Sequence, residues 1–226
     1  MEAPDYRSRI LLLLAFGMAM AYLEAAVVVY LRELYYPGGF TFPMRAMPGH
    51  ITIIEIARET ATIVMLVAVA GLAARRFWDR FGCFLIMFGV WDIFYYVWLR
   101  VTIDWPSTLT SWDVLFLIPV PWTGPVIAPI LVSAVMILAG LGITHQYARG
   151  IAFRPTGLAW LLTVVATIVI LYTFMNDSAA ATAGGMPESY MYHLLAAGLA
   201  FYLAAFVHAY GRSAKNTGTS VQGRRK

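Results

Sequence analysis

The stretch ILLLLAFGMAMAYLEAAVVVYLRE, residues 10–33, decides the class of this protein. It contains no proline, and a helix of about 20 predominantly apolar residues is long enough to cross the hydrocarbon core of a bilayer. The whole chain has the same character, because 61% of its 226 residues are hydrophobic and only 12% are charged. Soluble domains carry roughly 25% charged residues, so the composition indicates a chain surrounded by lipid.

Five further apolar runs lie between helix breakers such as Pro37-Gly38-Gly39 and Gly184-Gly185. The sequence therefore predicts an all-α polytopic membrane protein with about six transmembrane helices in one bundle. The predicted spans are residues 10–33, 51–74, 82–101, 125–144, 157–175 and 190–210. They form one predicted domain, residues 1–211. A basic tail, residues 212–226, follows and is expected to be disordered in the cytoplasm.

The distribution of Lys and Arg predicts the orientation in the membrane. Twelve of the 16 basic residues flank the predicted spans on the side of the N-terminus. The four on or near the other side are Arg32, Arg45, Arg58 and Arg100. Positive charge is enriched in cytoplasmic segments, so both termini are expected inside, in a bacterial cytoplasmic (inner) membrane.

A rival interpretation makes the first apolar run a secretory signal peptide, cleaved near Ala19-Met20-Ala21. That would leave five spans with the orientation unchanged. The run continues past this point to Leu34 without a helix breaker, which favours an uncleaved first span.

Several classes of function have no support in the sequence. The net charge of +4 comes from residues beside apolar runs and not from a basic surface patch, so we expect no nucleic-acid partner. The single cysteine, Cys83, permits no intrachain disulfide and is interpreted as an apolar core residue. The chain has no Walker loop and no nucleotide, flavin or haem signature. The cofactor is left open, with a divalent metal as one candidate.

Ionisable residues within spans cost about 2.5–3.5 kcal/mol each on insertion scales, and they therefore indicate function. Glu24, Glu59 and Asp92 belong to three different predicted spans. Measured along each helix, all three lie roughly 12–14 Å below the outer interface. Three helices thus place a carboxylate at one depth.

A polar stripe follows one face of the second predicted span, at positions i, i+3, i+4 and i+7. Its members are Glu55, Arg58, Glu59 and Thr62. Such a stripe must face protein or a water-filled cavity. Tyr96 follows Asp92 by four residues, and His193 lies at about the depth of Glu55 in the last span. The predicted site for a cation, a proton or a substrate comprises Glu24, Glu55, Arg58, Glu59, Asp92, Tyr96 and His193. The candidate metal ligands within it are Glu55, Glu59, Asp92 and His193.

The charge of this layer leaves two interpretations open. Four carboxylates and one guanidinium would carry a net charge of −3 if all were ionised. In the first interpretation some carboxylates hold protons, or a bound cation lies among them. In the second, Arg58 pairs with Glu55 and Glu59, and the remaining carboxylates bond to hydroxyl groups of neighbouring helices.

The segment 102–124 is rich in tryptophan and proline and too short in its apolar centre to span the bilayer. We interpret it as a re-entrant or interfacial lid over the carboxylate layer, with Asp104, Trp105, Trp112 and Asp113 as lid or vestibule residues. The alternative is an aromatic belt that only anchors the protein at the level of the headgroups.

Three functions fit these observations. The first is the binding or transport of a small cation or proton. The second is a membrane-embedded enzyme acting on a lipid or quinone, in which Trp91, Tyr95, Tyr96 and Trp98 would line an apolar slot. The third is an accessory subunit whose polar stripe faces other membrane subunits. The two similar halves that are common in carriers are not evident in the sequence.

Overall fold

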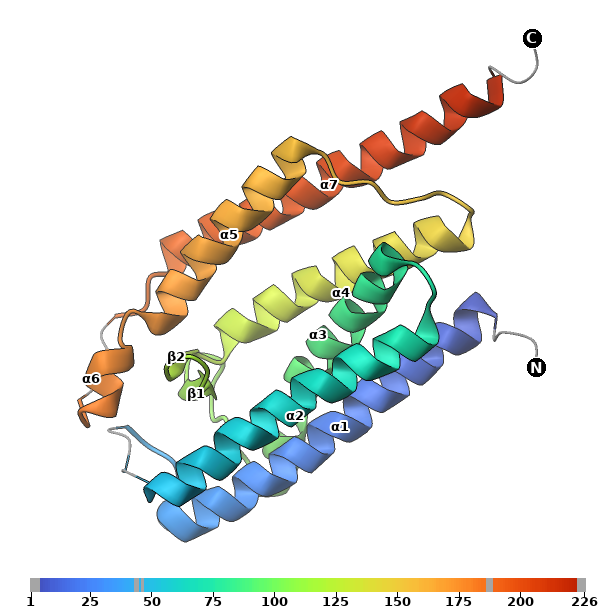
Figure 1. Ribbon diagram of the computed structural model, residues 1–226. Coiled ribbons are helices and arrows are strands. Elements are labelled where there is room, and N and C mark those ends of the chain that lie inside the picture. Colours follow the sequence, from blue (N-terminus) through green and yellow to red (C-terminus); the bar gives the residue numbers. More distant parts are fainter. Residues whose placement is uncertain (1–4, 43–44, 46, 186–188, 223–226) are drawn as a thin grey trace.

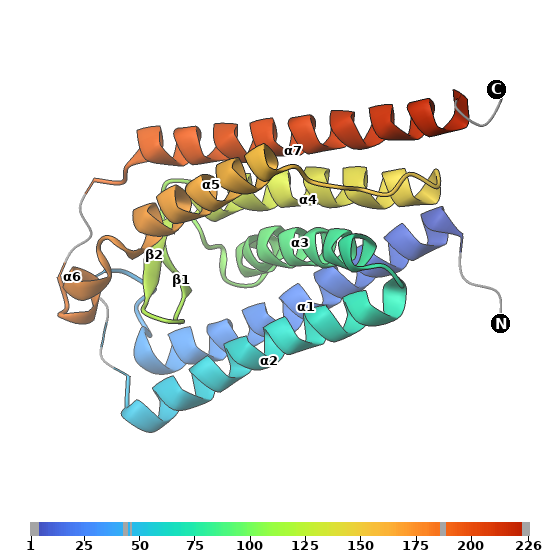
Figure 2. The same cartoon turned by 45° about the horizontal axis from the view of Figure 1, so that its top comes forward.

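The computed structural model of the chain describes residues 5–42, 45, 47–185 and 189–222. Its elements follow in the order α1 (Tyr6–Tyr35), α2 (Gly49–Ala73), α3 (Phe77–Ile103), β1 (Trp112–Phe116), β2 (Trp122–Pro125), α4 (Ile127–Ala148), α5 (Gly157–Met175), α6 (Ser178–Thr182) and α7 (Tyr192–Gln222) (Figure 1). The long helices run side by side, with the two strands and α6 gathered at one end of the bundle (Figure 2).

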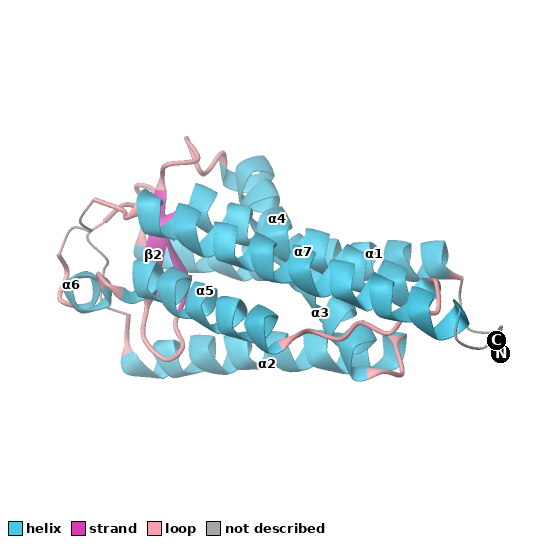
Figure 3. Cartoon of the chain, turned by 90° about the horizontal axis from the view of Figure 1, so that it is seen from above, coloured by secondary structure: helices cyan, strands magenta, loops and turns pink. Residues whose placement is uncertain are grey.

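The helices form two groups. α3 packs between α1 and α4, and α2 packs against α3. α5 pairs with α7, and α7 joins this pair to the rest of the molecule through α4. The first turn of α1 and the last turns of α7 lie at the same end of the bundle, opposite the strands (Figure 3).

Within the described residues, five helical segments are long and apolar enough to cross a membrane, as an integral membrane protein requires. They are Tyr6–Tyr35, Phe77–Ile103, Ile127–Ala148, Gly157–Thr182 and Tyr192–Ala214. α2 covers the second predicted span but is not among the five, and it is the helix that carries the polar stripe. Each of the six predicted spans thus coincides with a helix, and five of these helices meet the criteria for a transmembrane span.

Two features differ from the sequence-based expectation. The segment between α3 and α4 contains a two-stranded antiparallel sheet, whereas the sequence predicted an all-α fold. Trp112 lies opposite Pro125 and Asp113 opposite Gly124, with an irregularity in register between Val114 and Phe116. α7 continues as a helix to Gln222, through most of the segment for which we expected a disordered tail, and residues 223–226 lie outside the described part.

Polar contacts fix the end of the bundle where α1 begins. The Asp5 carboxylate accepts a hydrogen bond from the backbone N–H of Ser8 at 2.8 Å, which caps α1 and holds the pKa of Asp5 below its usual range. Arg9 donates two hydrogen bonds to the Asp79 carboxylate, at 2.9 and 3.1 Å, and so ties α1 to the first turn of α3. No pattern in the sequence had singled out Asp79.

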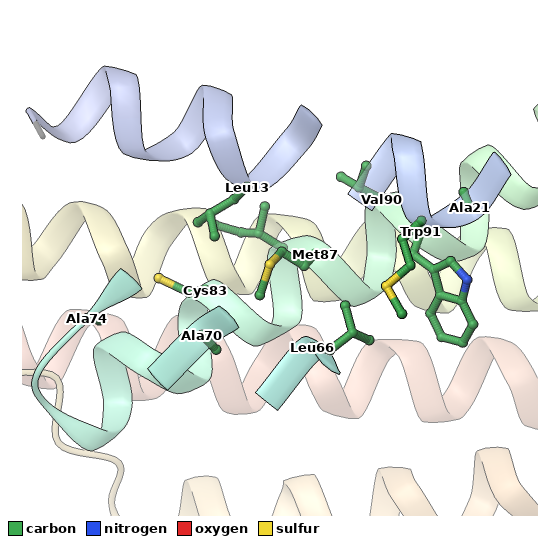
Figure 4. Close-up of a cluster of buried hydrophobic side chains, with 11 residues drawn as sticks. Leu13, Ala21, Leu66, Ala70, Ala74, Cys83, Met87, Val90 and Trp91 are labelled. Carbon is green, nitrogen blue, oxygen red and sulfur yellow. The ribbon is translucent and has the colours of Figure 1, made fainter. Parts of the chain in front are cut away.

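An apolar core fills the space between α1, α2 and α3 (Figure 4). It includes Leu13 from α1, Leu66 from α2, and Cys83, Met87 and Trp91 from α3, all of them buried. Cys83 is therefore a core residue, as its sequence context predicted. The core lies between Glu59 and the end of the bundle where α1 begins, because Leu66 is two helical turns beyond Glu59 on α2.

Glycines let α3 and α4 approach each other closely. A Cβ atom added to Gly140 would lie 2.6 Å from the backbone oxygen of Gly82, and one added to Gly89 would lie 2.6 Å from the backbone oxygen of Ser133. Backbone atoms cannot yield as a flexible side chain does. Such small-residue contacts are a common way to pack helices in lipid, where the hydrophobic effect between helices is weak.

This packing predicts opposite effects for two glycine-to-alanine substitutions. Gly140→Ala should lower the free energy of unfolding by about 1–3 kcal/mol, because the new methyl group overpacks the α3–α4 contact. Gly71→Ala, on α2 with no atom within 4 Å of its added Cβ, should raise stability by up to about 1 kcal/mol through helix propensity. Thermal unfolding of the two variants in detergent would measure both effects. Equal stability of the two variants would contradict the assignment of a tight crossing.

Candidate functional site

Arg58 on α2 lies between two carboxylates from different helices. Its Nη1 is 3.0 Å from Glu24 Oε1 on α1, and its Nε donates to Glu55 Oε2 at 2.8 Å on its own helix. The other oxygen of Glu24 accepts a hydrogen bond from Trp91 Nε1 at 2.7 Å. The Glu24 carboxylate on α1 therefore links Arg58 on α2 to Trp91 on α3. The structure brings together Glu24, Glu55 and Arg58, which the sequence had placed near the same depth.

Glu59 is buried, with 5% of its surface exposed. Its Oε2 accepts a hydrogen bond at 3.0 Å from the backbone N–H of Leu117, just after β1. Glu59 forms no ion pair with any residue that the structure describes, although Arg58 is its neighbour in the chain. Its one assigned partner is thus a neutral main-chain donor. The sequence-based alternative, in which Arg58 pairs with both Glu55 and Glu59, holds for Glu55 but not for Glu59.

Asp92 has a neutral partner of a different kind. Its Oδ2 accepts a hydrogen bond from the Ser133 hydroxyl at 2.7 Å, across the contact between α3 and α4. Ser133 is buried, and in the described part of the chain no basic side chain pairs with Asp92. Asp92 does not line the polar cavity described below, so the predicted carboxylate layer is divided between two places.

A second ion pair joins α1 to the sheet. Arg32 Nη2 lies 3.0 Å from Asp113 Oδ1 on β1, and both side chains are buried. The Arg32 guanidinium stacks over the ring of Trp105 at 3.8 Å and over that of Phe40 at 4.6 Å. Burial raises the pKa of the Asp113 carboxyl to about 6, while the positive charge of Arg32 opposes this shift.

A polar cavity of about 120 Å³ lies between α1, α2, the sheet and the loop that follows α1. Its charged lining consists of Arg32, Arg45, Glu55, Arg58, Glu59 and Asp113. Arg32 Nη1 and Asp113 Oδ2 are buried without a hydrogen-bond partner among the described residues. Because a buried water molecule needs only about 10–15 Å³ of such volume and a few polar partners, the cavity has room and bonding capacity for several waters or a small hydrated ion.

The predicted lid residues point to different places. Asp113 and Trp105 reach the ion pair with Arg32. Asp104 is exposed at the end of α3 and pairs with Arg100. Trp112 contacts the ring of Tyr190, away from the cavity.

Two further predicted site residues have separate positions. Tyr96 is buried on α3, close enough to Asp113 and Asp92 to interact electrostatically with both. His193 is exposed on α7, a helix whose main partners are α5 and α4, and it does not line the cavity.

The candidate metal site of Glu55, Glu59, Asp92 and His193 is not assembled. Within the part of the chain that the structure describes, no three His, Cys, Asp or Glu side chains converge as metal ligands would. The depth of each residue along its helix was a sound reason to group these side chains. Depth does not give the direction in which each side chain points, and His193 points elsewhere.

Sequence reasoning missed three groups. Arg32 was interpreted only as a topology signal, although it lies two turns from Glu24 on the same face of α1. Ser133 could have been found as a hydroxyl within an apolar span. The backbone N–H of Leu117 has no signature in the sequence, because every residue except proline carries one.

Comparison of the chain with protein-family models, with curated proteins and with solved structures finds no match. The geometry of the site is therefore the basis on which a function is proposed.

The position of Arg58 predicts a large effect of its removal. Arg58→Gln leaves Glu24 and Glu55 without a counter-charge, and should lower the free energy of unfolding by roughly 3 kcal/mol. The matched control is Arg100→Gln, which removes an exposed ion pair and exposed hydrogen bonds to the backbone oxygens of Asp104 and Pro106, and should cost only about 1 kcal/mol. Chemical unfolding in detergent would compare the two, and similar losses for both variants would contradict a bridging role for Arg58.

Proposed function

We propose that this membrane protein binds a proton or a small cation at Glu59, taken up from the polar cavity between α1, α2 and the sheet. The observation that carries this proposal is the environment of Glu59. It is buried, it lines the cavity, and its one assigned hydrogen bond comes from a neutral donor. A buried carboxylate in such a place is stable when a proton or a bound cation neutralises it.

The neighbouring charges support this choice of residue. Arg58 is already engaged by Glu24 and Glu55, and Arg32 is engaged by Asp113. In a purely structural network each buried carboxylate would share a cationic partner, as these three do. Glu59 is the cavity carboxylate that forms no ion pair with a described residue, and the charge of Arg58 acts on it only from beyond ion-pair distance. Proton relays in membranes commonly use carboxylates of this kind.

Access to Glu59 would be from the end of the bundle that carries the sheet. The loop residues Tyr36, Phe40 and Arg45 line the cavity at that end. On the other side of Glu59, an apolar core separates it from the opposite end of the bundle. Leu66 and Met87 belong to this core (Figure 4). We therefore propose binding from one side, with any transport requiring the helices to move. By the positive-inside rule, this side is the outer face of a bacterial cytoplasmic membrane, and both termini are inside.

Infrared spectroscopy would test the proposal directly. The protein in lipid vesicles, in a buffer whose only cation is choline, should show the C=O stretch of a neutral carboxylic acid. Glu59→Gln should reduce the intensity of that band, and the part that remains would belong to other neutral carboxylic acids such as Asp92, whose assigned partner is also neutral. The control Glu33→Gln, which changes an exposed carboxylate on α1, should leave it unchanged. Sodium chloride added in place of choline chloride would reduce the band if a metal cation competes with the proton.

Identical carboxylic-acid bands in the unaltered protein and the Glu59→Gln variant would overturn the proposal. Transport is tested separately, with the same proteins in vesicles that contain a pH-sensitive dye. Proton movement in the unaltered protein and in Glu33→Gln, but not in Glu59→Gln, would extend the proposal from binding to transport.

A further inference from the structure

A second cavity, with a different chemistry, lies in the opposite half of the bundle. It has a volume of about 320 Å³ and lies between α3, α4, α5 and α7. Its lining is almost wholly apolar and includes Phe81, Leu85, Met136, Ala139, Trp160 and Ala205. None of its lining residues lines the polar cavity, so it forms a separate feature of the molecule.

The packing of the helices explains why this groove exists. α5 packs mainly against α7, and α7 makes the main contact with α4. The backbones of α5 and α3 are therefore not closely packed against each other. Alanines at positions 139 and 205 leave space where larger side chains would fill it. Trp160 is half-exposed at the edge of the groove, as expected of a residue that faces lipid.

Two arginines flank one end of the groove. Arg76 immediately precedes Phe77 and Trp78, and Arg154 lies between Phe153 and Pro155, with all four neighbours in the groove lining. Both arginines are exposed and form no ion pair with a described residue. Both also lie close enough to Tyr147, near the end of α4, to interact with it electrostatically. The two positive charges therefore belong to one region of the surface.

We propose that this groove binds an anionic phospholipid, with an acyl chain among the apolar residues and the headgroup phosphate at Arg76 and Arg154. The apolar lining fits a hydrocarbon chain, and the two arginines place positive charge where the headgroup would lie. A headgroup with a net negative charge is attracted by them, whereas a headgroup with no net charge is not. A transmembrane helix of a partner, about 10–12 Å across with its side chains, is too wide for a cavity of this volume. Basic pockets between helices on the cytoplasmic side are a known way to hold acidic headgroups.

Native mass spectrometry would test the proposal with two lipids that have the same chains. The full-length protein in detergent is mixed with equal amounts of dioleoyl phosphatidylglycerol and dioleoyl phosphatidylcholine, and the bound species are counted. The unaltered protein should retain one phosphatidylglycerol in preference to phosphatidylcholine. Removing the charges in Arg76→Gln/Arg154→Gln should weaken phosphatidylglycerol binding about fivefold per arginine, and thus about twenty-five-fold in the double variant.

Two control variants separate the groove from general electrostatics. Arg7→Gln/Arg100→Gln removes the same amount of charge from exposed sites outside the groove lining, and should leave the preference intact. Ala139→Leu narrows the groove without changing charge, and should reduce the retention of both lipids. Because Arg76 and Arg154 are exposed and form no ion pair with a described residue, their replacement should leave the fold intact, which elution as a single species in gel filtration would verify.

Two results would overturn the proposal. One is equal retention of the two lipids by the unaltered protein. The other is an equal loss of the preference in both double-arginine variants, which would assign it to overall charge and not to this groove.

Discussion

The Arg58 guanidinium, held between Glu24 and Glu55, is the contact on which the polar half of the molecule depends. Charged groups removed from water are tolerated when they are paired with good geometry. This requirement fixes the height of α2 relative to α1, because Arg58 must meet Glu24 across the two helices. Glu59 follows directly in the chain, so the same contact sets where its carboxylate meets the sheet.

The contact between α3 and α4 combines close packing of the two helices with a buried hydrogen bond between them. Gly89 has no Cβ, and the backbone of α4 at Ser133 comes as close as that absence allows. Asp92 lies three residues after Gly89, hence on the same face of α3, and accepts the hydrogen bond of the Ser133 hydroxyl. The short distance between the helices therefore brings a small hydroxyl within reach of the carboxylate. A wider crossing would have needed a longer polar side chain at position 133.

The sequence was most informative where a pattern extends along one helix. The length of the apolar runs located the helices, and the spacing along α2 placed Glu55, Arg58 and Glu59 on one face. It was least informative about direction around a helix and about backbone partners. His193 has a suitable depth but lies on α7, which packs on the far side of α4 from the cavity. The two strands were not predicted, because they are short and pair through main-chain hydrogen bonds. The segment that contains them, between α3 and α4, has the sequence of an apolar loop with prolines.

The tether between α2 and the sheet is made by the main chain of Leu117 and not by its side chain. Homologous chains could therefore exchange this residue for almost any other without losing the bond to the glutamate. Proline is the one replacement that removes the donor. Sequence variation at position 117 would look like neutral drift even though the position holds two parts of the molecule together. Its importance would be visible only as the avoidance of a single amino acid.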